Sequence, residues 1–273
     1  ARKENIPLRV LKAGGDKDES MIDKHPNIEF VDGGKKAIES WIAAGKRPLI
    51  AGTAWLFASD GWVEGDSDDR LDFLFIDEAG QGSLANTVAA SRSAKNLVLL
   101  GDQRQLEQPI QGLHPGDAGL SALQYALKDV EESKEGAPVI HPVVPEGTGL
   151  FLGVSRRMHP DVCEFISDSV YEGRLESFAD CGRQRSAIAN SPNSLIDKEH
   201  GIVFSPVEHD GNTQSSDEEA ERVLAIYNEL CGREYTDRDG KTQTLGLDDF
   251  LFIAPYNAQV VPLRGHLPAK ARI

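Results

Sequence analysis

Residues 71–102 read LDFLFIDEAGQGSLANTVAASRSAKNLVLLGD, and this stretch decides the predicted fold. Two continuous apolar runs, 71–77 and 96–102, flank residues 83–94, whose composition suits a helix. Continuous apolar runs are typical of parallel strands that are covered on both faces. A third run of this kind, 47–54, precedes the stretch. The pattern therefore predicts strand–helix–strand units and a parallel α/β sheet.

Acidic residues follow both strands predicted in this stretch. Asp77 and Glu78 end the first apolar run, and Asp102 ends the second. Open parallel sheets bind their ligands beyond the carboxyl ends of the strands. There an Asp can hold a magnesium ion, directly or through water, and a neighbouring Glu can orient or deprotonate an attacking water. A surface turn explains the same residues, so the acids alone leave both interpretations open.

The composition is that of a globular protein without a membrane span. Hydrophobic residues make up 40% and charged residues 27% of the 273 residues, and no apolar stretch approaches the length of a transmembrane helix. The first ten residues lack the apolar segment of a secretory signal. Three cysteines are too few for a disulfide framework or a zinc cluster. We expect a cytoplasmic protein that contacts no membrane.

The formal net charge of −15 limits how this chain can bind nucleic acid. Phosphate binding needs clustered Lys and Arg side chains, so nucleic acid is not expected to cover the whole surface. One basic groove on an acidic body remains compatible with the composition, because net charge governs solubility and non-specific association rather than a single cleft.

The chain is predicted to form two α/β domains, residues 1–147 and 148–273. Residues 128–149, rich in charge, Pro and Gly, are interpreted as the surface connection between them. In the second domain, strands are predicted at 149–154, 201–207 and 250–259, and helices at 159–173 and 216–230. In the first of these helices the apolar face is predicted to comprise Val162, Phe165, Ile166 and Val170. Ser216 and Glu219 have capping-box spacing at the start of the second.

Short motifs recur along this chain in a fixed order. They are AGTAWLF (51–57), DEAGQ (77–81), GDQRQL (101–106), RRMHP (156–160) and APYNAQ (254–259). In content and order they resemble the motifs of superfamily 1 helicases, in the branch that includes the nonsense-mediated-decay helicase. The resemblance extends over roughly residues 47–260. It is strongest to large bacterial proteins in which a RecB-like nuclease region precedes the helicase.

The resemblance implies two RecA-like (P-loop NTPase) parallel-sheet domains that bind ATP and Mg²⁺ in the cleft between them. In the first half, Asp77 would hold the magnesium ion through its water shell, and Glu78 would activate the hydrolytic water. Asp102 and Gln105 would lie beside the γ-phosphate. Thr53 would contact the backbone of single-stranded DNA or RNA through its hydroxyl. A solvated loop position explains Gln105 equally well.

In the second half, the resemblance implies that Arg157 reaches the transferred phosphoryl group and neutralises its charge. A surface ion pair is the alternative for this residue. Arg156 replaces the family's tyrosine, whose ring can stack on adenine. A guanidinium can also stack on a base, so adenine binding can survive this change or be weakened by it. Gln259 would point into the nucleotide cleft, whereas Tyr256 and His159 have packing or capping roles as alternatives.

The family's P-loop, GxxxxGK[ST], has no counterpart here; residues 32–37, DGGKKA, fit it poorly and are interpreted as a loop. The last two family motifs are also absent. We therefore expect an internal fragment with both RecA-like domains incomplete, whose partners include the missing P-loop segment and a nuclease domain of the same parent chain. The isolated fragment is predicted to be inactive. The alternatives are a degenerate RecA-like scaffold or regulatory module, and a doubly wound domain that binds another anion.

Overall fold

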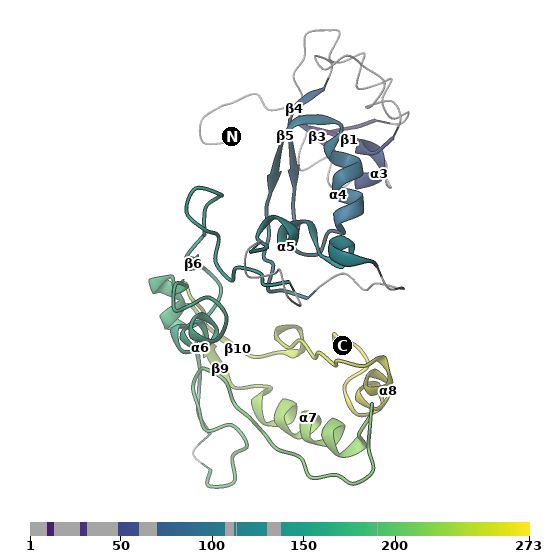
Figure 1. The fold of residues 1–273 in the computed structure, drawn as a ribbon. Helices are drawn as coiled ribbons and strands as arrows, with labels where there is room; N and C mark the ends of the chain where they lie inside the picture. The colour runs from purple at the N-terminus through teal and green to yellow at the C-terminus, as the bar shows by residue number, and fades with distance from the viewer. Residues whose placement is uncertain are drawn as a thin grey trace. The chain divides into compact units, whose positions relative to one another are not determined.

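The computed structural model describes residues 10–13, 28–31, 49–59, 70–106, 112, 114–129, 138–189 and 191–273 (Figure 1). The chain divides into two compact units, Ala1–Pro145 and Glu146–Ile273. The loop predicted at residues 32–37 lies outside the described residues. The assignment of residues 1–147 and 148–273 to two RecA-like domains stays a prediction.

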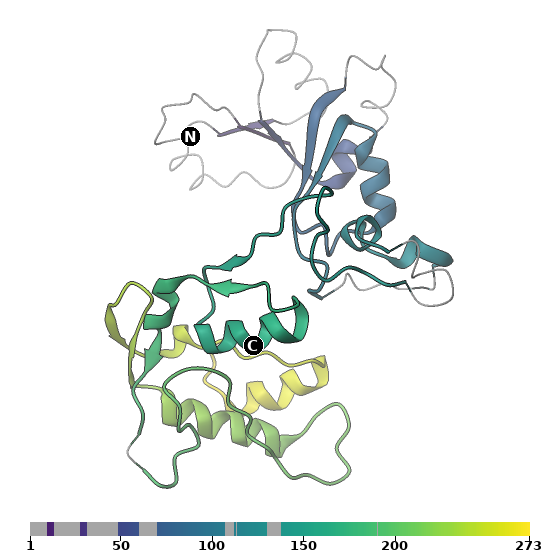
Figure 2. The same cartoon turned by 60° about the vertical axis from the view of Figure 1, so that its left-hand side comes forward.

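The first unit contains small parallel sheets. Strands β1 (Val10–Ala13), β2 (Ile28–Val31) and β3 (Leu49–Ala51) form one sheet in the order β2-β1-β3. Strands β4 (Leu71–Ile76) and β5 (Ala94–Leu99) pair in parallel, with Ile76 opposite Leu99. Helix α4 (Leu84–Ser91) connects them and lies along one side of the pair, as both views show (Figures 1 and 2). The predicted strand–helix–strand unit and the α/β class are thus confirmed.

The β4–β5 pair is buried mainly on the side that faces the helices. Leu74 packs with Ala90 of α4 and with Phe57 of the short helix α3 (Ala54–Phe57). Phe73 and Phe75 are 55% and 57% exposed. Because successive side chains of a strand point to opposite faces, these two rings lie on the face opposite Leu74, which no helix of the described residues covers. The expectation that the strand is covered on both faces is therefore wrong.

Residues 138–144 pack within the first unit rather than forming a plain surface connection. The Asp129 N–H donates to the Val139 carbonyl at 2.8 Å, and the His141 N–H donates to the Leu127 carbonyl at 3.0 Å. Val143 is buried. These contacts hold the segment against helix α5 (Ala122–Ala126), which follows the 3-10 turn η3 (Gly116–Gly119). The polar composition of the linker therefore did not reveal that some of its apolar residues are buried.

The second unit is built on helices with small sheets. Helices α7 (Asp217–Leu230) and α8 (Asn257–His266) pack side by side (Figure 2) through a core of Ala220, Leu263 and Leu267. Helix α6 (Pro160–Val170) precedes them. The sheets are β6–β7, which is parallel, and β8–β9–β10, which is antiparallel. The remaining bounds are β6 Val154–Ser155, β7 Glu176–Ser177, η5 Ala179–Arg183, β8 Arg185–Ser186, β9 Glu234–Thr236, β10 Thr242–Thr244 and η6 Leu247–Asp249.

Three strands predicted in the second half are wrong in whole or in part. The predicted strand at 149–154 is reduced to β6, and residues 201–207 and 250–256 form no strand. Phe204, Leu251 and Ile253 are exposed. Among the described residues these extended segments have no neighbouring strand with which to pair, so apolar composition alone does not make them strands. The turn predicted near Asn257 is the start of α8.

Helices α6 and α7 confirm the helical predictions in their position. Their capping residues His159 and Ser216 accept hydrogen bonds from the N–H groups of Asp161 and Glu219. The predicted apolar face of α6 is wrong at Phe165, which is exposed, whereas Cys163 and Ser167 are buried. None of the helices in the described part of the chain has the length and apolar character needed to span a bilayer.

Candidate functional site

The loops that follow β4 and β5 lie against each other at the carboxyl edge of the sheet. The Leu100 N–H donates to the Ile76 carbonyl at 2.9 Å, and the Ala79 N–H donates to the Leu100 carbonyl at 2.8 Å. These bonds extend the parallel ladder past the end of the strands. Asp77 and Glu78 are therefore held next to the loop that carries Asp102, as the strand ends predict.

Two glycines make this close approach of the loops possible. A Cβ atom on Gly80 would lie 2.7 Å from the carbonyl carbon of Asp102 and closer still to its oxygen. Gly101 has φ +145°, and a Cβ there would lie 2.9 Å from the Ala79 nitrogen. Because both obstacles are main-chain atoms, no side-chain movement relieves them. The glycines of DEAGQ and GDQRQL thus bring the acidic turns together.

Glu78 has a backbone conformation that is uncommon for its residue type. Its φ is +52°, and such left-handed residues other than glycine cost about 1–3 kcal/mol and are concentrated at functional sites. The Glu78 N–H donates to Oδ1 of Asp77 at 3.1 Å. Both carboxylates are exposed at the tip of the turn. The turn presents two sets of carboxylate oxygens, the ligand type preferred by magnesium and its bound water.

Asp102 organises the second loop. Its Oδ1 accepts the Arg104 N–H at 2.9 Å, and its Oδ2 accepts Nε2 of Gln105 at 3.3 Å. Gln105 is thereby oriented by Asp102, the residue that the resemblance also places beside the γ-phosphate. Gln103, which sequence reasoning missed, is buried and donates to the carbonyls of His141 and Pro142, both at 2.8 Å.

A cavity of about 710 Å³ lies between β3, α3, β4 and α4, and Asp77 lines it together with Gly52 and Ala54. Thr53, between these two residues, is the N-cap of α3, but its side chain makes no capping hydrogen bond. Two positions further on, Trp55 is 78% exposed. Sequence reasoning missed this indole; its signal was an aromatic residue within the motif AGTAWLF.

The second unit holds the two motif arginines at the start of α6. Arg157 is exposed, and its guanidinium has no carboxylate within ion-pair distance among the described residues. It lines a cavity of about 450 Å³. The Arg156 guanidinium lies 4.3 Å above the centre of the Phe178 ring. One face of the group predicted to stack on adenine is therefore already covered by an internal aromatic side chain.

Gln259 is buried, and both ends of its amide bind the main chain of Ser216. The Ser216 N–H donates to Oε1 at 2.6 Å, and Nε2 donates to the Ser216 carbonyl at 2.9 Å. Glu219 therefore has no part in a reciprocal capping box, because the N–H that its side chain would accept is taken by Gln259. Tyr256, by contrast, is exposed and begins α8 without a side-chain cap.

The structure thus groups the predicted site residues within each unit. Asp77, Glu78, Asp102 and Gln105 lie together in the first unit, with Thr53 beside the cavity that Asp77 lines. Arg156 and Arg157 adjoin in the second unit, whereas Gln259 packs between α7 and α8. The catalytic, nucleotide-binding, metal-binding and nucleic-acid-binding roles of all these residues stay predictions.

Comparisons with known proteins agree with this arrangement of motifs. A family model described as an AAA domain matches residues 144–272. The chain is 25% identical over 202 residues to the 3'-5' exoribonuclease HELZ2 of Mus musculus, which covers 70% of this chain. It is 29% identical over 126 residues, or 45% of this chain, to the DNA replication ATP-dependent helicase/nuclease DNA2 of Gallus gallus. It is 26% identical over 222 residues to the DNA-binding protein SMUBP-2 of Rattus norvegicus, covering 78%.

The chain is similar to helicases of superfamily 1. The resemblance carried by the motifs is confirmed by these matches, and the small parallel sheets fit a RecA-like fold. The chain spans 6%, 11% and 20% of the lengths of the three relatives. The activity of the whole protein is therefore a matter of proposal.

Proposed function

We propose that this chain is part of an ATP-dependent helicase or translocase that moves along single-stranded DNA or RNA, and that its two units are parts of RecA-like domains. The observation that carries the proposal is the joint placement of Asp77, Glu78 and Asp102. The parallel register of β4 and β5 and the Gly80–Asp102 contact hold them at one sheet edge. In a chain that is similar to superfamily 1 helicases, carboxylates grouped at one edge of the sheet are suited to binding magnesium for phosphoryl transfer.

The residues of the first unit have distinct roles in this proposal. Asp77 binds the water shell of Mg²⁺, which would neutralise charge on the phosphates of bound ATP. Glu78, exposed on a left-handed backbone, would orient and deprotonate the attacking water. Asp102 holds Gln105 by a hydrogen bond, so that the amide can report the presence of the γ-phosphate. Arg157 of the second unit supplies positive charge to the transferred phosphoryl group.

Thr53 and Trp55 are proposed to contact the nucleic acid strand. The Thr53 hydroxyl, which is not used as a helix cap, binds a backbone phosphate without reading sequence. The exposed Trp55 indole offers a flat apolar surface on which any base can stack, a contact worth about 1–3 kcal/mol per base in single-strand binding proteins. Relatives named as a helicase/nuclease and as a DNA-binding protein support this assignment.

The proposal is tested by nucleic-acid-stimulated ATP hydrolysis of the longer parent protein. Glu78→Gln and Arg157→Ala are each expected to lower kcat by about a hundredfold or more. Glu172→Gln is the matched control for the acid, because Glu172 is also exposed with φ +56° but lies outside the motifs. Arg183→Ala, which removes a surface pair with Asp180, is the control for the arginine.

Full activity of Glu78→Gln or Arg157→Ala, with folding intact, would contradict the assigned roles. The isolated 273-residue chain is expected to show no ATP turnover. Turnover by that chain that Glu78→Gln abolishes would contradict this expectation.

A degenerate RecA-like scaffold without ATPase activity is the second candidate. It is favoured by Gln259 and Arg156, because both residues predicted to bind nucleotide are engaged by internal partners. A parent protein that binds nucleic acid but neither binds nor hydrolyses ATP would favour the scaffold.

A further inference from the structure

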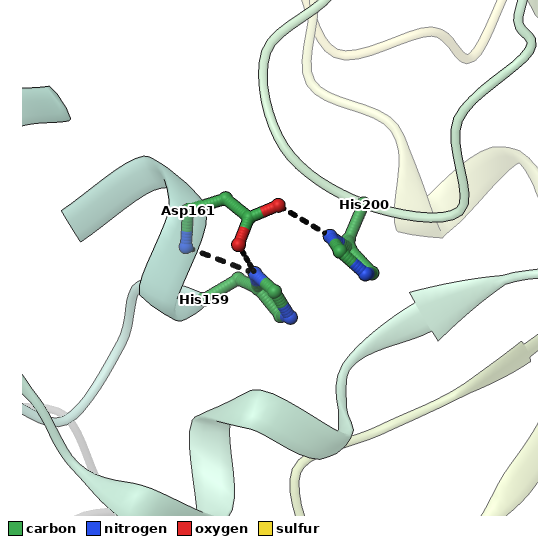
Figure 3. A group of neighbouring side chains, drawn as sticks. All are labelled: His159, Asp161 and His200. Atoms are coloured by element: carbon green, nitrogen blue, oxygen red, sulfur yellow. Dashed lines mark hydrogen bonds and ion pairs between the residues drawn. The ribbon is translucent and has the colours of Figure 1, made fainter. Parts of the chain in front are cut away.

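Three potential metal ligands meet at the start of α6. His159, Asp161 and His200 each offer one ligand atom, and these atoms all lie within 4.8 Å of one another. Both imidazoles turn Nδ1 towards the Asp161 carboxylate (Figure 3). The Asp161 Oδ2 to His200 Nδ1 distance is 2.8 Å, and the Asp161 Oδ1 to His159 Nδ1 distance is 3.6 Å. The two rings stack with their centres 3.9 Å apart.

The backbone around this cluster holds the three side chains in place. His159 is the N-cap of α6 and Asp161 lies in its first turn, so local helix geometry sets their separation. His200 comes from a loop 39 residues further along the chain. That loop is tied to β8 by a 2.8 Å hydrogen bond from the Ser186 N–H to the Glu199 carbonyl. It then turns at Gly201, with φ +98°, directly beside Asp161.

The surroundings of His159 favour its neutral imidazole. Burial lowers the pKa of His159, and the neighbouring His200 lowers it further, while Asp161 opposes both effects. A neutral imidazole keeps a nitrogen lone pair for a metal ion. The Gly182 backbone also forms a hydrogen bond with the His159 ring. Metal-binding histidines typically make a second bond of this kind, which fixes the orientation of the ring.

We propose that His159, Asp161 and His200 form a binding site for a divalent transition-metal ion of the zinc class. Two imidazole nitrogens and one carboxylate suit such ions, whereas magnesium and calcium prefer oxygen ligands alone. Two ligand atoms about 2.1 Å from one ion at a tetrahedral angle lie about 3.4 Å apart. The observed 2.8 and 3.6 Å separations bracket this value. The ligand atoms of all three groups lie within 4.8 Å of one another, so side-chain rotation without movement of the main chain would bring them onto one ion.

The metal site would have a structural role, in which the ion joins two segments of the chain. This role does not depend on the ATP chemistry proposed above. An ion there would connect the loop of His200 to the start of α6, where the RRMHP motif ends. The cavity of about 450 Å³ beside the two histidines gives water access to the remaining coordination positions. Binding replaces the hydrogen bond that the Asp161 N–H donates to His159 Nδ1 at 3.2 Å. It also replaces the hydrogen bond between His200 Nδ1 and Asp161 Oδ2.

The test uses the untagged, metal-free 273-residue chain titrated with Co²⁺, followed by visible absorption, and with Zn²⁺, followed by calorimetry. One equivalent of either ion is expected to bind, and Zn²⁺ is expected to displace Co²⁺. His159→Asn and His200→Ala should each weaken binding at least tenfold. Asn is a strong N-cap residue, so the first variant removes the imidazole while preserving the start of α6. His209→Ala is the control, because His209 lies outside the cluster and pairs with Glu219 at 3.9 Å.

The expected result also includes stabilisation, because an ion that binds only the folded chain raises its unfolding temperature. Zn²⁺ should raise this temperature in the wild-type chain and in His209→Ala but not in the two site variants. The proposal is overturned if the wild-type chain binds no ion, or if the site variants bind as tightly as the control. It is also overturned if bound Co²⁺ shows thiolate charge-transfer bands, since these would place the ion on the cysteines.

Discussion

Replacing Gln259 with alanine is expected to destabilise the second unit by about 2–4 kcal/mol. The amide of Gln259 satisfies both main-chain polar groups of Ser216, with bonds of 2.6 and 2.9 Å. Each buried main-chain group that loses its partner costs about 1–3 kcal/mol, less where water can enter the space left behind. The affected N–H belongs to the N-cap of α7, so the loss falls at the contact between α7 and α8. Gln259→Glu keeps the acceptor but sets an oxygen against the Ser216 carbonyl, and about 1–3 kcal/mol is expected.

The assay is urea unfolding followed by far-UV circular dichroism and by tryptophan fluorescence. All three tryptophans, Trp41, Trp55 and Trp62, lie in the first unit, so their transition is an internal control that should not shift. Hydrogen exchange of residues 216–224 locates the change in α7. Asn257→Ala, an exposed position at the start of α8, is the matched variant and should change the unfolding free energy by less than about 0.5 kcal/mol. An unchanged unfolding free energy in Gln259→Ala would refute a stabilising role for the Gln259–Ser216 hydrogen bonds and would favour the predicted role of Gln259 in nucleotide binding.

Two further outcomes are expected from single contacts. Gly80→Ala should destabilise the first unit by more than about 2 kcal/mol, because its Cβ would meet the Asp102 carbonyl. Gly82→Ala is the control and should be neutral or stabilising, because the nearest atoms to its Cβ lie at 3.8 Å. Equal unfolding curves for the two variants, followed by tryptophan fluorescence, would contradict this prediction. Hydrogen bonds from Ser194 and from the Leu195 and Ile196 N–H groups lower the pKa of Glu229 from 4.5 to about 2. Because the folded-state pKa is depressed, its stabilisation is present above pH 4.5 and lost as the pH falls towards 2. Acid titration of the second unit should therefore be less steep in Glu229→Gln, and a superimposable profile would argue against the role.

Local sequence signals predicted the elements that depend on near neighbours in the chain. The helix starts at Ser83, His159 and Ser216 each rest on a hydrogen bond to an N–H two or three residues away. The strand–helix–strand unit of residues 71–102 likewise follows from its pattern, and with it the edge at which Asp77 and Asp102 meet. The strands predicted at 201–207 and 250–259 failed because a strand needs a partner, and hydrophobic composition does not supply one.

The motif order by itself determined that this chain resembles a superfamily 1 helicase, because each motif is a short run of residues that can be read directly from the sequence. Only the tertiary structure decided which distant groups share their hydrogen bonds. Gln259 binds Ser216 across 43 residues, and His200 reaches Asp161 across 39. No periodicity marks such pairs, because their approach is set by the packing of α7 on α8 and by the turn at Gly201. A residue's place in a motif therefore indicates its chemistry, while the packing around it decides whether that chemistry is available to a ligand.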